Sequence, residues 1–254
     1  MRSLAGAGVY FRTMAAFALV WWLLSLWKGN TALLPSPLAV VDAVIELAQD
    51  GELFKHAAIS LLRLFASLAL AIALAVPLGL WMGLSRVADD LIDPVIEILR
   101  PISGIAWIPL ALFMFGIGNA LPVFIMTYAA FFPIVLGTIS GVRGVDRRLV
   151  NAARTMGVPM HRIVTTVVLP AATPTLLVAI RLGVASAWTA VVAAELIGAP
   201  SGLGYAIEWY RELLMTPQVM AFIVMIGVLG FLFDATLRGL STRLTPWAPR
   251  TVSK

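Results

Sequence analysis

The chain has 254 residues, 61% of them hydrophobic and 12% charged, whereas a soluble domain is about half apolar and a quarter charged. The composition therefore predicts a polytopic membrane protein, with one transmembrane domain over residues 1–254. No cysteine is present, which excludes disulfides, thiol nucleophiles and cysteine-based metal sites. The two histidines, His56 and His161, stand far apart, so we expect no metal site. The net charge of +5 is attributed to cytoplasmic loops and not to nucleic-acid binding.

Six apolar segments are expected to cross the membrane as helices, so the predicted fold class is all-α. A helix needs about 20 apolar residues to cross a bilayer. The first segment follows basic residues, as a signal peptide does, but its bulky tryptophans leave no small-residue cleavage site, and we interpret it as an uncleaved span. The six segments are about residues 13–27, 64–84, 102–117, 121–142, 173–198 and 219–237.

A shorter segment after Pro35 predicts an amphipathic helix that lies along the outer membrane surface. Ser36 can cap this helix, Pro37 suits its first turn, and Gly51 can end it. Its apolar residues recur at helical spacing, but it is too short and too polar to span a bilayer.

The distribution of basic residues predicts the orientation. Six spans place both termini on one side, and Lys and Arg concentrate in cytoplasmic segments. If the N-terminus is inside, the outer segments hold only Lys28, Lys55, Arg63 and Arg211, while Arg181 lies within a span. The inner segments then hold Arg2, Arg12, Arg86, Arg100, Arg143, Arg147, Arg148, Arg154, Arg162, Arg238, Arg243, Arg250 and Lys254. Both termini are therefore predicted to be cytoplasmic.

Residues 143–170 form a polar, basic loop between two spans. Within it, Asn151 can cap a short helix to Met156, and Gly157 can end that helix because glycine enters the left-handed conformation at little cost. The next two residues turn the chain, and a second helical run begins at His161. A helix–glycine–helix elbow of this kind is suited to being held by another protein.

The same loop resembles the cytoplasmic coupling loop of ABC importer permeases. That loop follows the pattern Glu-Ala-Ala, three residues, Gly, nine residues, Ile, one residue, Leu-Pro. Here Ala152, Ala153, Gly157, Val167 (for Ile), Leu169 and Pro170 fall at the matching positions, and Asn151 replaces the Glu. The resemblance implies that the ATPase-coupling residues are Asn151, Ala152, Ala153, Arg154, Thr155, Met156, Gly157 and Val158.

Further motifs resemble the taurine, aliphatic sulfonate and nitrate branch of these permeases, and the likeness extends over nearly the whole chain. The tail in particular is similar to that of taurine permeases. The motifs are Arg100-Pro101, Ala106-Trp107-Ile108-Pro109-Leu110, Phe115-Gly116-Ile117-Gly118, Val192-Ala193-Ala194-Glu195-Leu196-Ile197, Gly202-Leu203-Gly204 and the tail Arg243-Leu244-Thr245-Pro246-Trp247.

This resemblance implies a type I ABC importer permease in the bacterial inner membrane, translocating a small anion such as taurine or another sulfonate. Nitrate, bicarbonate or a heterocyclic vitamin precursor are alternative substrates. A secondary transporter or channel that works without an ATPase is the alternative from another class, and a membrane enzyme is disfavoured because the sequence offers no catalytic site.

The implied partners are two ABC ATPase subunits, a periplasmic or lipid-anchored substrate-binding protein, a second permease copy in a homodimer, and membrane lipid, with no nucleic acid. The chain has no glycine-rich phosphate loop ending in Lys-Ser or Lys-Thr. We therefore expect it to bind no cofactor and to be no enzyme, while ATP and Mg belong to the partner subunits.

Two sets of residues are candidates for the translocation pathway. Arg181, Trp188 and Glu195 are spaced by seven, so they form one stripe about 21 Å long on a helix. Ionisable groups within a span usually face a bundle interior or a water-filled path. Alternatively, Arg181 lies shallow in the membrane and Glu195 pairs with another helix, and Asp234 forms a local ion pair with Arg238.

The second set lies where residues 102–117 begin irregularly. Pro101 and Pro109 each remove a backbone donor, and irregular backbone at membrane depth is tolerated only where it is buried or lines a cavity. Ser103 and Trp107 are therefore pathway candidates, and a packed kink is the alternative.

Overall fold

The computed structural model describes residues 2–29 and 33–246, and this part of the chain is helical, without a strand. The chain divides into two compact units, Met1–Ile59 with Ser201–Val228 and Ser60–Pro200 with Leu229–Lys254, which are described one at a time. The predicted all-α fold class is confirmed. Trp247 of the tail motif, together with Arg250 and Lys254, lies outside the described residues.

The first unit holds a surface helix that begins as the sequence predicts. The Ser36 hydroxyl accepts a hydrogen bond from the Ala39 N–H at 3.2 Å, and Pro37 occupies the first turn. The helix buries Val40, Ala43 and Leu47 on one face. The elements of this unit are α1 (Arg2–Lys28), α2 (Pro37–Gln49), α10 (Leu203–Glu212), the start of α3 (Glu52–Leu84) and the first part of α11 (Thr216–Leu244).

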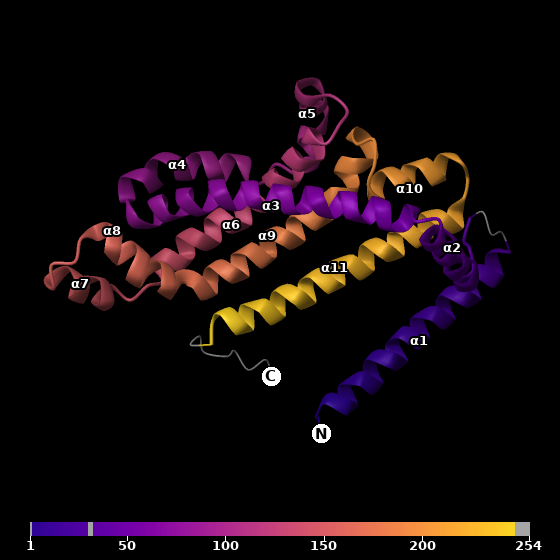
Figure 1. Cartoon of the computed structure of the whole chain (residues 1–254), viewed down its shortest axis with the longest axis horizontal. Helices are drawn as coiled ribbons and strands as arrows, with labels where there is room; N and C mark the ends of the chain where they lie inside the picture. Colours follow the sequence, from indigo (N-terminus) through magenta and orange to yellow (C-terminus); the bar gives the residue numbers. More distant parts are fainter. Residues whose placement is uncertain (1, 30–32, 247–254) are drawn as a thin grey trace. The chain divides into compact units, whose positions relative to one another are not determined.

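The second unit is centred on α6 and α9, which run side by side (Figure 1). Its apolar core includes Leu64, Met126, Ile134 and Val191, all buried. The unit contains the rest of α3 and α11, together with α4 (Arg86–Leu99), the 3₁₀ turn η1 (Gly104–Trp107), α5 (Ile108–Phe115), α6 (Ala120–Arg143), α7 (Arg147–Thr155), α8 (Met160–Ile163), the π-helical turn η2 (Val164–Val168) and α9 (Leu169–Gly198).

Four of the described helical segments are long and apolar enough to cross a membrane: Glu52–Leu84, Ala120–Arg143, Met160–Gly198 and Thr216–Ser241. A bent pair, Arg86–Leu99 with Gly104–Phe115, brings the number to as many as five, and α1 contains the shorter apolar stretch Ala15–Trp27. Five of the six apolar segments expected from the sequence each fall within one helix, although several bounds differ, and the sixth, residues 102–117, is divided between η1 and α5.

The largest difference in a helix start concerns α3. The apolar run predicts a span over 64–84, whereas α3 begins at Glu52. The prediction stops at Arg63 because a charged side chain ends an apolar run, yet in the structure Arg63 is only 4% exposed and is hydrogen-bonded within the protein. A helix can continue through a buried charge where that charge has partners.

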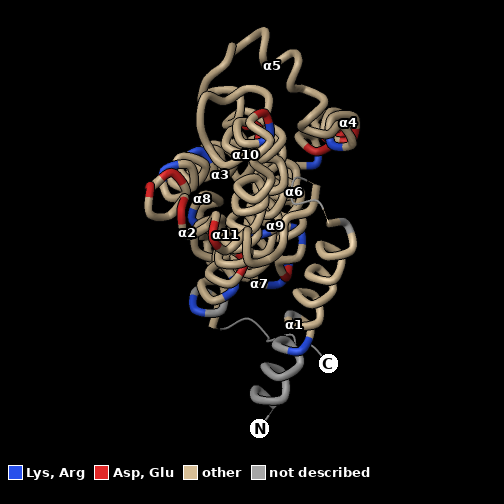
Figure 2. The backbone as a smooth tube through the Cα atoms, turned by 90° about the vertical axis from the view of Figure 1, so that its right-hand side faces the viewer, with Lys and Arg blue, Asp and Glu red and all other residues tan. Residues whose placement is uncertain are grey.

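The second difference concerns residues 102–117, for which the sequence predicts one span that begins irregularly. The irregular start is a bend of 83° between α4 and the η1–α5 segment, and the apolar run is divided between η1 and the short helix α5. Pro101 lies in the bend and Pro109 in the first turn of α5, and the Ser103 hydroxyl accepts from the Ile105 N–H at 3.4 Å to start a 3₁₀ turn. The preceding α4 is amphipathic and carries charges of both signs (Figure 2).

Glycines set the close approach of the helices in the second unit. A Cβ added at Gly79 would lie 2.7 Å from the Thr138 Cβ, and one at Gly83 would lie 2.7 Å from the Val142 Cβ. The Gly79-x-x-x-Gly83 spacing, which lets helices approach closely, therefore brings α3 close to α6. Between α6 and α9, Gly137 faces Ala179 so closely that any Cβ would clash with the alanine methyl.

We predict that Gly137→Leu destabilises the protein by about 1–3 kcal/mol, because added side-chain atoms must push α6 away from α9. The measurement is the melting temperature of the detergent-solubilised protein and its abundance in the membrane. Gly227→Leu is the matched control, since a Cβ at Gly227 on α11 meets no atom within 4 Å. Equal melting temperatures for the two variants would contradict the proposed packing constraint.

Candidate functional site

The short helix of the polar loop begins earlier than its sequence predicts. Asp146, not Asn151, caps α7, and its carboxylate accepts from the Arg148 N–H at 2.8 Å. The predicted cap at Asn151 is wrong, because an aspartate five residues upstream caps the same helix and lets it include Arg147. Asn151 is instead an exposed residue in the middle of α7.

The predicted end of this helix at Gly157 is confirmed. Gly157 has φ +76°, the Val158 N–H donates to the Ala153 carbonyl at 3.1 Å, and the Gly157 N–H donates to the Arg154 carbonyl at 3.0 Å. These two bonds form a Schellman motif, which satisfies the last carbonyls of a helix through a left-handed residue. The elbow therefore has one defined backbone conformation.

One side of the elbow packs against the rest of its unit. Ala153 is 6% exposed and clusters with Val142, Ile163 and Val168, and Val158 packs against the same cluster. Of the implied coupling residues, Ala153 and Val158 thus face inward. The exposed ones are Asn151, Ala152, Arg154, Thr155, Met156 and Gly157.

The exposed side of the elbow combines apolar and basic side chains. Met156 is 75% exposed and Leu149 is 54% exposed. Arg154, also exposed, donates to the Met160 sulfur at 3.7 Å. Because exposed large apolar side chains on a held turn mark interaction surfaces, this side of the elbow is suited to bind a partner.

The elbow continues into α9 through the π-helical turn η2. π-Helical turns are uncommon and occur frequently at functional sites. Pro170 then occupies the first turn of α9, and Pro174 lies inside it. Since α9 extends without interruption to Gly198, one helix joins the elbow to the other end of the unit.

The three residues of the predicted stripe lie along α9 but in different surroundings. The Arg181 Nε donates to the Asp234 Oδ1 at 2.6 Å, and Asp234 also pairs with Arg238. The Trp188 ring lies against that of Phe233, with centroids 5.7 Å apart. Arg181 and Trp188 line a small cavity of about 180 Å³ between α9 and α11, and the local pair of Asp234 with Arg238 is as predicted.

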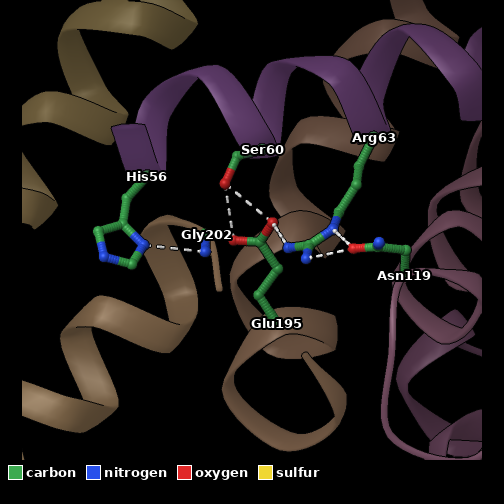
Figure 3. Close-up of polar contacts among 6 residues, drawn as sticks. All are labelled: His56, Ser60, Arg63, Asn119, Glu195 and Gly202. Carbon is green, nitrogen blue, oxygen red and sulfur yellow. Dashed lines mark hydrogen bonds and ion pairs between the residues drawn. The ribbon is translucent and has the colours of Figure 1, made fainter. Parts of the chain in front are cut away.

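Glu195 lies in a buried ion-paired cluster on the α3 side of α9 (Figure 3). Its Oε1 accepts from the Arg63 Nη1 at 2.7 Å, and the Ser60 hydroxyl lies 2.8 Å from both of its carboxylate oxygens. Arg63 also donates to the Asn119 Oδ1, at 3.0 Å from Nε and 2.6 Å from Nη2. Glu195 is 0% exposed, so it opens to no cavity in this structure.

Arg63, Ser60 and Asn119 were missed by sequence reasoning. Arg63 stands just before an apolar run, where a basic residue usually marks the membrane boundary. Helical spacing could have indicated two of these residues. Ser60 and Arg63 are three residues apart and therefore share a face of α3 with buried Leu64.

Ser103 and Trp107 lie near a cavity of about 640 Å³ between the η1 segment and the facing sides of α6 and α9. Ser103 is exposed and lines it, together with Arg100, Tyr128, Ser186 and Thr189. Trp107 does not line this cavity, and its ring packs against that of Tyr128 with centroids 5.9 Å apart. The Trp107 Nε1 is buried and has no hydrogen-bond partner within the described part of the chain.

In the first unit, His56 holds the turn that precedes α10. Its Nδ1 accepts from the Gly202 N–H at 3.0 Å (Figure 3), and its Nε2 lies 3.0 Å from the Glu52 carboxylate. Nε2 therefore carries the ring proton, because Nδ1 acts as an acceptor. Among the residues that the structure describes, no group of His, Cys, Asp and Glu could hold a metal ion.

With this geometry established, comparison with known proteins is informative. Residues 75–246 match the family described as binding-protein-dependent transport system inner membrane component. The chain is 35% identical over 241 residues to the taurine transport system permease protein of Escherichia coli, covering 92% of this chain and 88% of that protein. It is 28% identical over 243 residues to the nitrate import permease protein of Synechocystis sp., covering 92% and 87%.

The fold also matches a solved structure. The chain superposes on a chain of the MetNI methionine ABC transporter in an inward-facing conformation with a TM-score of 0.68. The sequence identity is 21%, and the match covers 78% of this chain and 98% of that one. At this identity the likeness shows a shared fold and nothing further.

We predict that Trp107→Phe costs less stability than Tyr128→Phe. The Tyr128 hydroxyl donates to the Leu99 carbonyl at 2.7 Å, so its removal costs about 1 kcal/mol, whereas removing an unpaired buried N–H relieves a desolvation penalty of about 1–3 kcal/mol. The check is thermal unfolding of the two purified variants. A lower melting temperature for the Trp107 variant would show that its indole N–H has a partner.

Proposed function

Because this chain belongs to the family of binding-protein-dependent transport system inner membrane components, we propose that it imports taurine or another small sulfonate. It is a multi-pass ABC importer permease and not an enzyme, since ATP hydrolysis belongs to separate subunits of such a transporter. The alternatives that work without an ATPase are thereby excluded.

The sulfonate assignment is supported by the 35% identity with the Escherichia coli taurine permease over 92% of the chain. That single observation carries the proposal. Nitrate is the second candidate, since a nitrate import permease is 28% identical over a similar length. Nitrate and the sulfonate group of taurine are both oxyanions, but taurine also carries an ammonium group, so the choice between them concerns both the oxyanion and the charge beside it.

The proposed ATPase-binding surface is the exposed side of the elbow, with Asn151, Ala152, Arg154, Thr155 and Met156 in contact with the ATPase. This surface is supported by its mixture of apolar and basic side chains on a turn of fixed conformation. Ala153 and Val158 contribute differently, because they pack inward and transmit force to the cluster around Ile163. ATP and Mg are bound by the partner.

The proposed complex has two copies of this chain, two ATPase subunits and a periplasmic or lipid-anchored binding protein. Both chain termini are proposed to be cytoplasmic, together with the elbow. The support is the concentration of basic residues in the segments on the elbow's side, including Arg147, Arg148, Arg154 and Arg162.

The cavity of about 640 Å³ is the proposed part of the translocation pathway in the second unit, and the residues around it are its proposed lining. Ser103, Ser186 and Thr189 bring hydroxyl groups to it, and Arg100 brings a positive charge. Hydroxyl donors and a guanidinium suit an oxyanion such as a sulfonate. Three of the predicted pathway residues, Arg181, Trp188 and Glu195, lie on α9, and the fourth, Trp107, lies in η1. These four residues do not line the cavity, so any contribution that they make to the pathway would accompany movement of α9.

The proposal is tested by reconstituting the chain with its ATPase in proteoliposomes and adding its binding protein loaded with radiolabelled substrate. We expect ATP-dependent uptake of taurine or an alkanesulfonate, and competition for the binding protein by other sulfonates. Uptake of nitrate with no uptake of any sulfonate would assign the chain to the nitrate importers. A heterocycle as the only imported substrate would reject the anion proposal altogether.

We predict that Gly157→Val reduces substrate uptake strongly while the permease stays in the membrane and the ATPase still hydrolyses ATP. No atom lies within 4 Å of a Cβ at Gly157, so the effect comes from the backbone alone. A left-handed conformation costs an ordinary L-residue about 1–2 kcal/mol, and more where the side chain is β-branched.

Gly157→Asn is the matched control, because asparagine tolerates the left-handed conformation. We expect this variant to retain most uptake. Uncoupling that is as severe in the asparagine variant as in the valine variant would mean that glycine is required for close contact with the ATPase and not for the backbone conformation.

A further inference from the structure

The buried cluster around Glu195 joins three segments that are far apart in the sequence (Figure 3). Ser60 and Arg63 come from α3, Asn119 precedes α6, and Glu195 is close to the end of α9. Ser60 and Glu195 are 0% exposed, and Arg63 is 4% exposed. Asn119 is exposed, so the buried part of the cluster consists of Ser60, Arg63 and Glu195 inside the second unit.

A second connection reinforces the cluster at the same end of α9. The Gly118 N–H donates to the Gly198 carbonyl at 2.9 Å. A Cβ at Gly198 would lie 2.7 Å from the Leu121 side chain, so α9 and the start of α6 are in direct contact there. The segment that carries Asn119 is thus bound to α9 both through its own backbone and through Arg63.

A cluster of this kind fixes position more than it stabilises the fold. Burying a charged pair costs desolvation energy that its mutual attraction offsets only in part, and apolar residues of similar size are often as stabilising. An Arg that donates to a carboxylate and to an amide at once is restricted to one arrangement of the three segments. The cluster therefore determines where the end of α9 lies relative to α3.

The cluster and the elbow lie at opposite ends of α9. Holding one end of this helix therefore affects how the helix moves when the other end is displaced. The elbow packs against the start of the same helical segment, through Ala153 and Ile163. Glu195 lies about 39 Å from Leu169 along α9, at about 1.5 Å per residue. A displacement applied at the elbow would therefore reach a helix whose opposite end is held.

We propose that Arg63, together with Ser60 and Asn119, is a positioning residue that clamps the end of α9 remote from the elbow. With that end held, movement of the elbow turns α9 and reshapes the cavity that Ser186 and Thr189 line, whereas without the clamp α9 shifts along its neighbours and the cavity keeps its shape. This inference rests on the proposed function, because it assumes that the ATPase moves the elbow.

The test compares ATP hydrolysis with substrate uptake in the reconstituted complex of permease, ATPase and binding protein. The main variant is the double substitution Arg63→Met with Glu195→Leu, which removes both charges and keeps apolar bulk. We expect it to melt within about 4 °C of the wild-type complex and to hydrolyse ATP at a similar rate. Uptake per ATP hydrolysed should fall about tenfold or more, since small misplacements are costly in preorganised sites.

A second variant, Arg63→Lys, keeps the charge if the double variant fails to fold. Lysine has no planar fork and cannot bind Glu195 and Asn119 in the same way, so uptake per ATP should again fall while the complex stays assembled. The control removes an exposed pair on α10, Glu208→Gln with Arg211→Gln, and should leave the ratio of uptake to hydrolysis unchanged.

The proposed role of Arg63 is rejected if either folded variant at the cluster transports with the wild-type ratio of uptake to hydrolysis. The cluster would then have only a structural role. The proposed role is also rejected if hydrolysis and uptake fall together in both variants, since that result indicates loss of ATPase binding. The wild-type complex is assayed first. ATP-driven uptake in that complex tests the proposed function, so the two failures are distinguishable.

Discussion

The close contact between α6 and α9 is the constraint on which the rest of the second unit depends. Where Gly137 meets Ala179, and where Gly183 meets Ile134, the two helices approach so closely that added side-chain atoms do not fit. Contacts of this kind supply much of the association between helices in a bilayer, because lipid tails solvate apolar side chains as well as other helices do. They hold the middle of α9 against α6.

Around this contact the protein places its buried charges at the end of α9 remote from the elbow. Arg63 and Glu195 are almost completely buried, and a charge in that position is costly unless it is paired and hydrogen-bonded. The elbow end is different, because its basic side chains are exposed. One helix thus connects an exposed surface suited to a partner protein with a buried ion pair, and this division supports its interpretation as a lever.

The sequence predicts well those features that depend on local chemistry. The left-handed residue at Gly157 and the cap at Ser36 follow from properties of single residues, and both are present in the structure. The loop motif likewise indicated the family, because its glycine and its Leu-Pro pair stand at fixed spacings.

Features that depend on tertiary partners could not be predicted in this way. The early start of α3 could not be predicted without knowing that Arg63 pairs with Glu195, more than a hundred positions away. The helix α7 begins at Arg147 because Asp146, and not Asn151, caps it. The bend of 83° between α4 and the η1 segment follows from prolines that the sequence shows, but its angle is set by packing. Glu195 was singled out correctly as an unusual charge, and only the structure identifies its partners.

The central claim is that the elbow and α9 move as one body, and a distance between two spin labels tests it most directly. The chain has no cysteine, so labels at Arg148→Cys on α7 and Ile197→Cys near the end of α9, both exposed positions, give one defined pair per chain. In the assembled complex the account predicts the same distance distribution within each permease chain with and without ATP. A shift of several ångströms on ATP binding would show that the π-helical turn bends, and it would contradict the rigid connection.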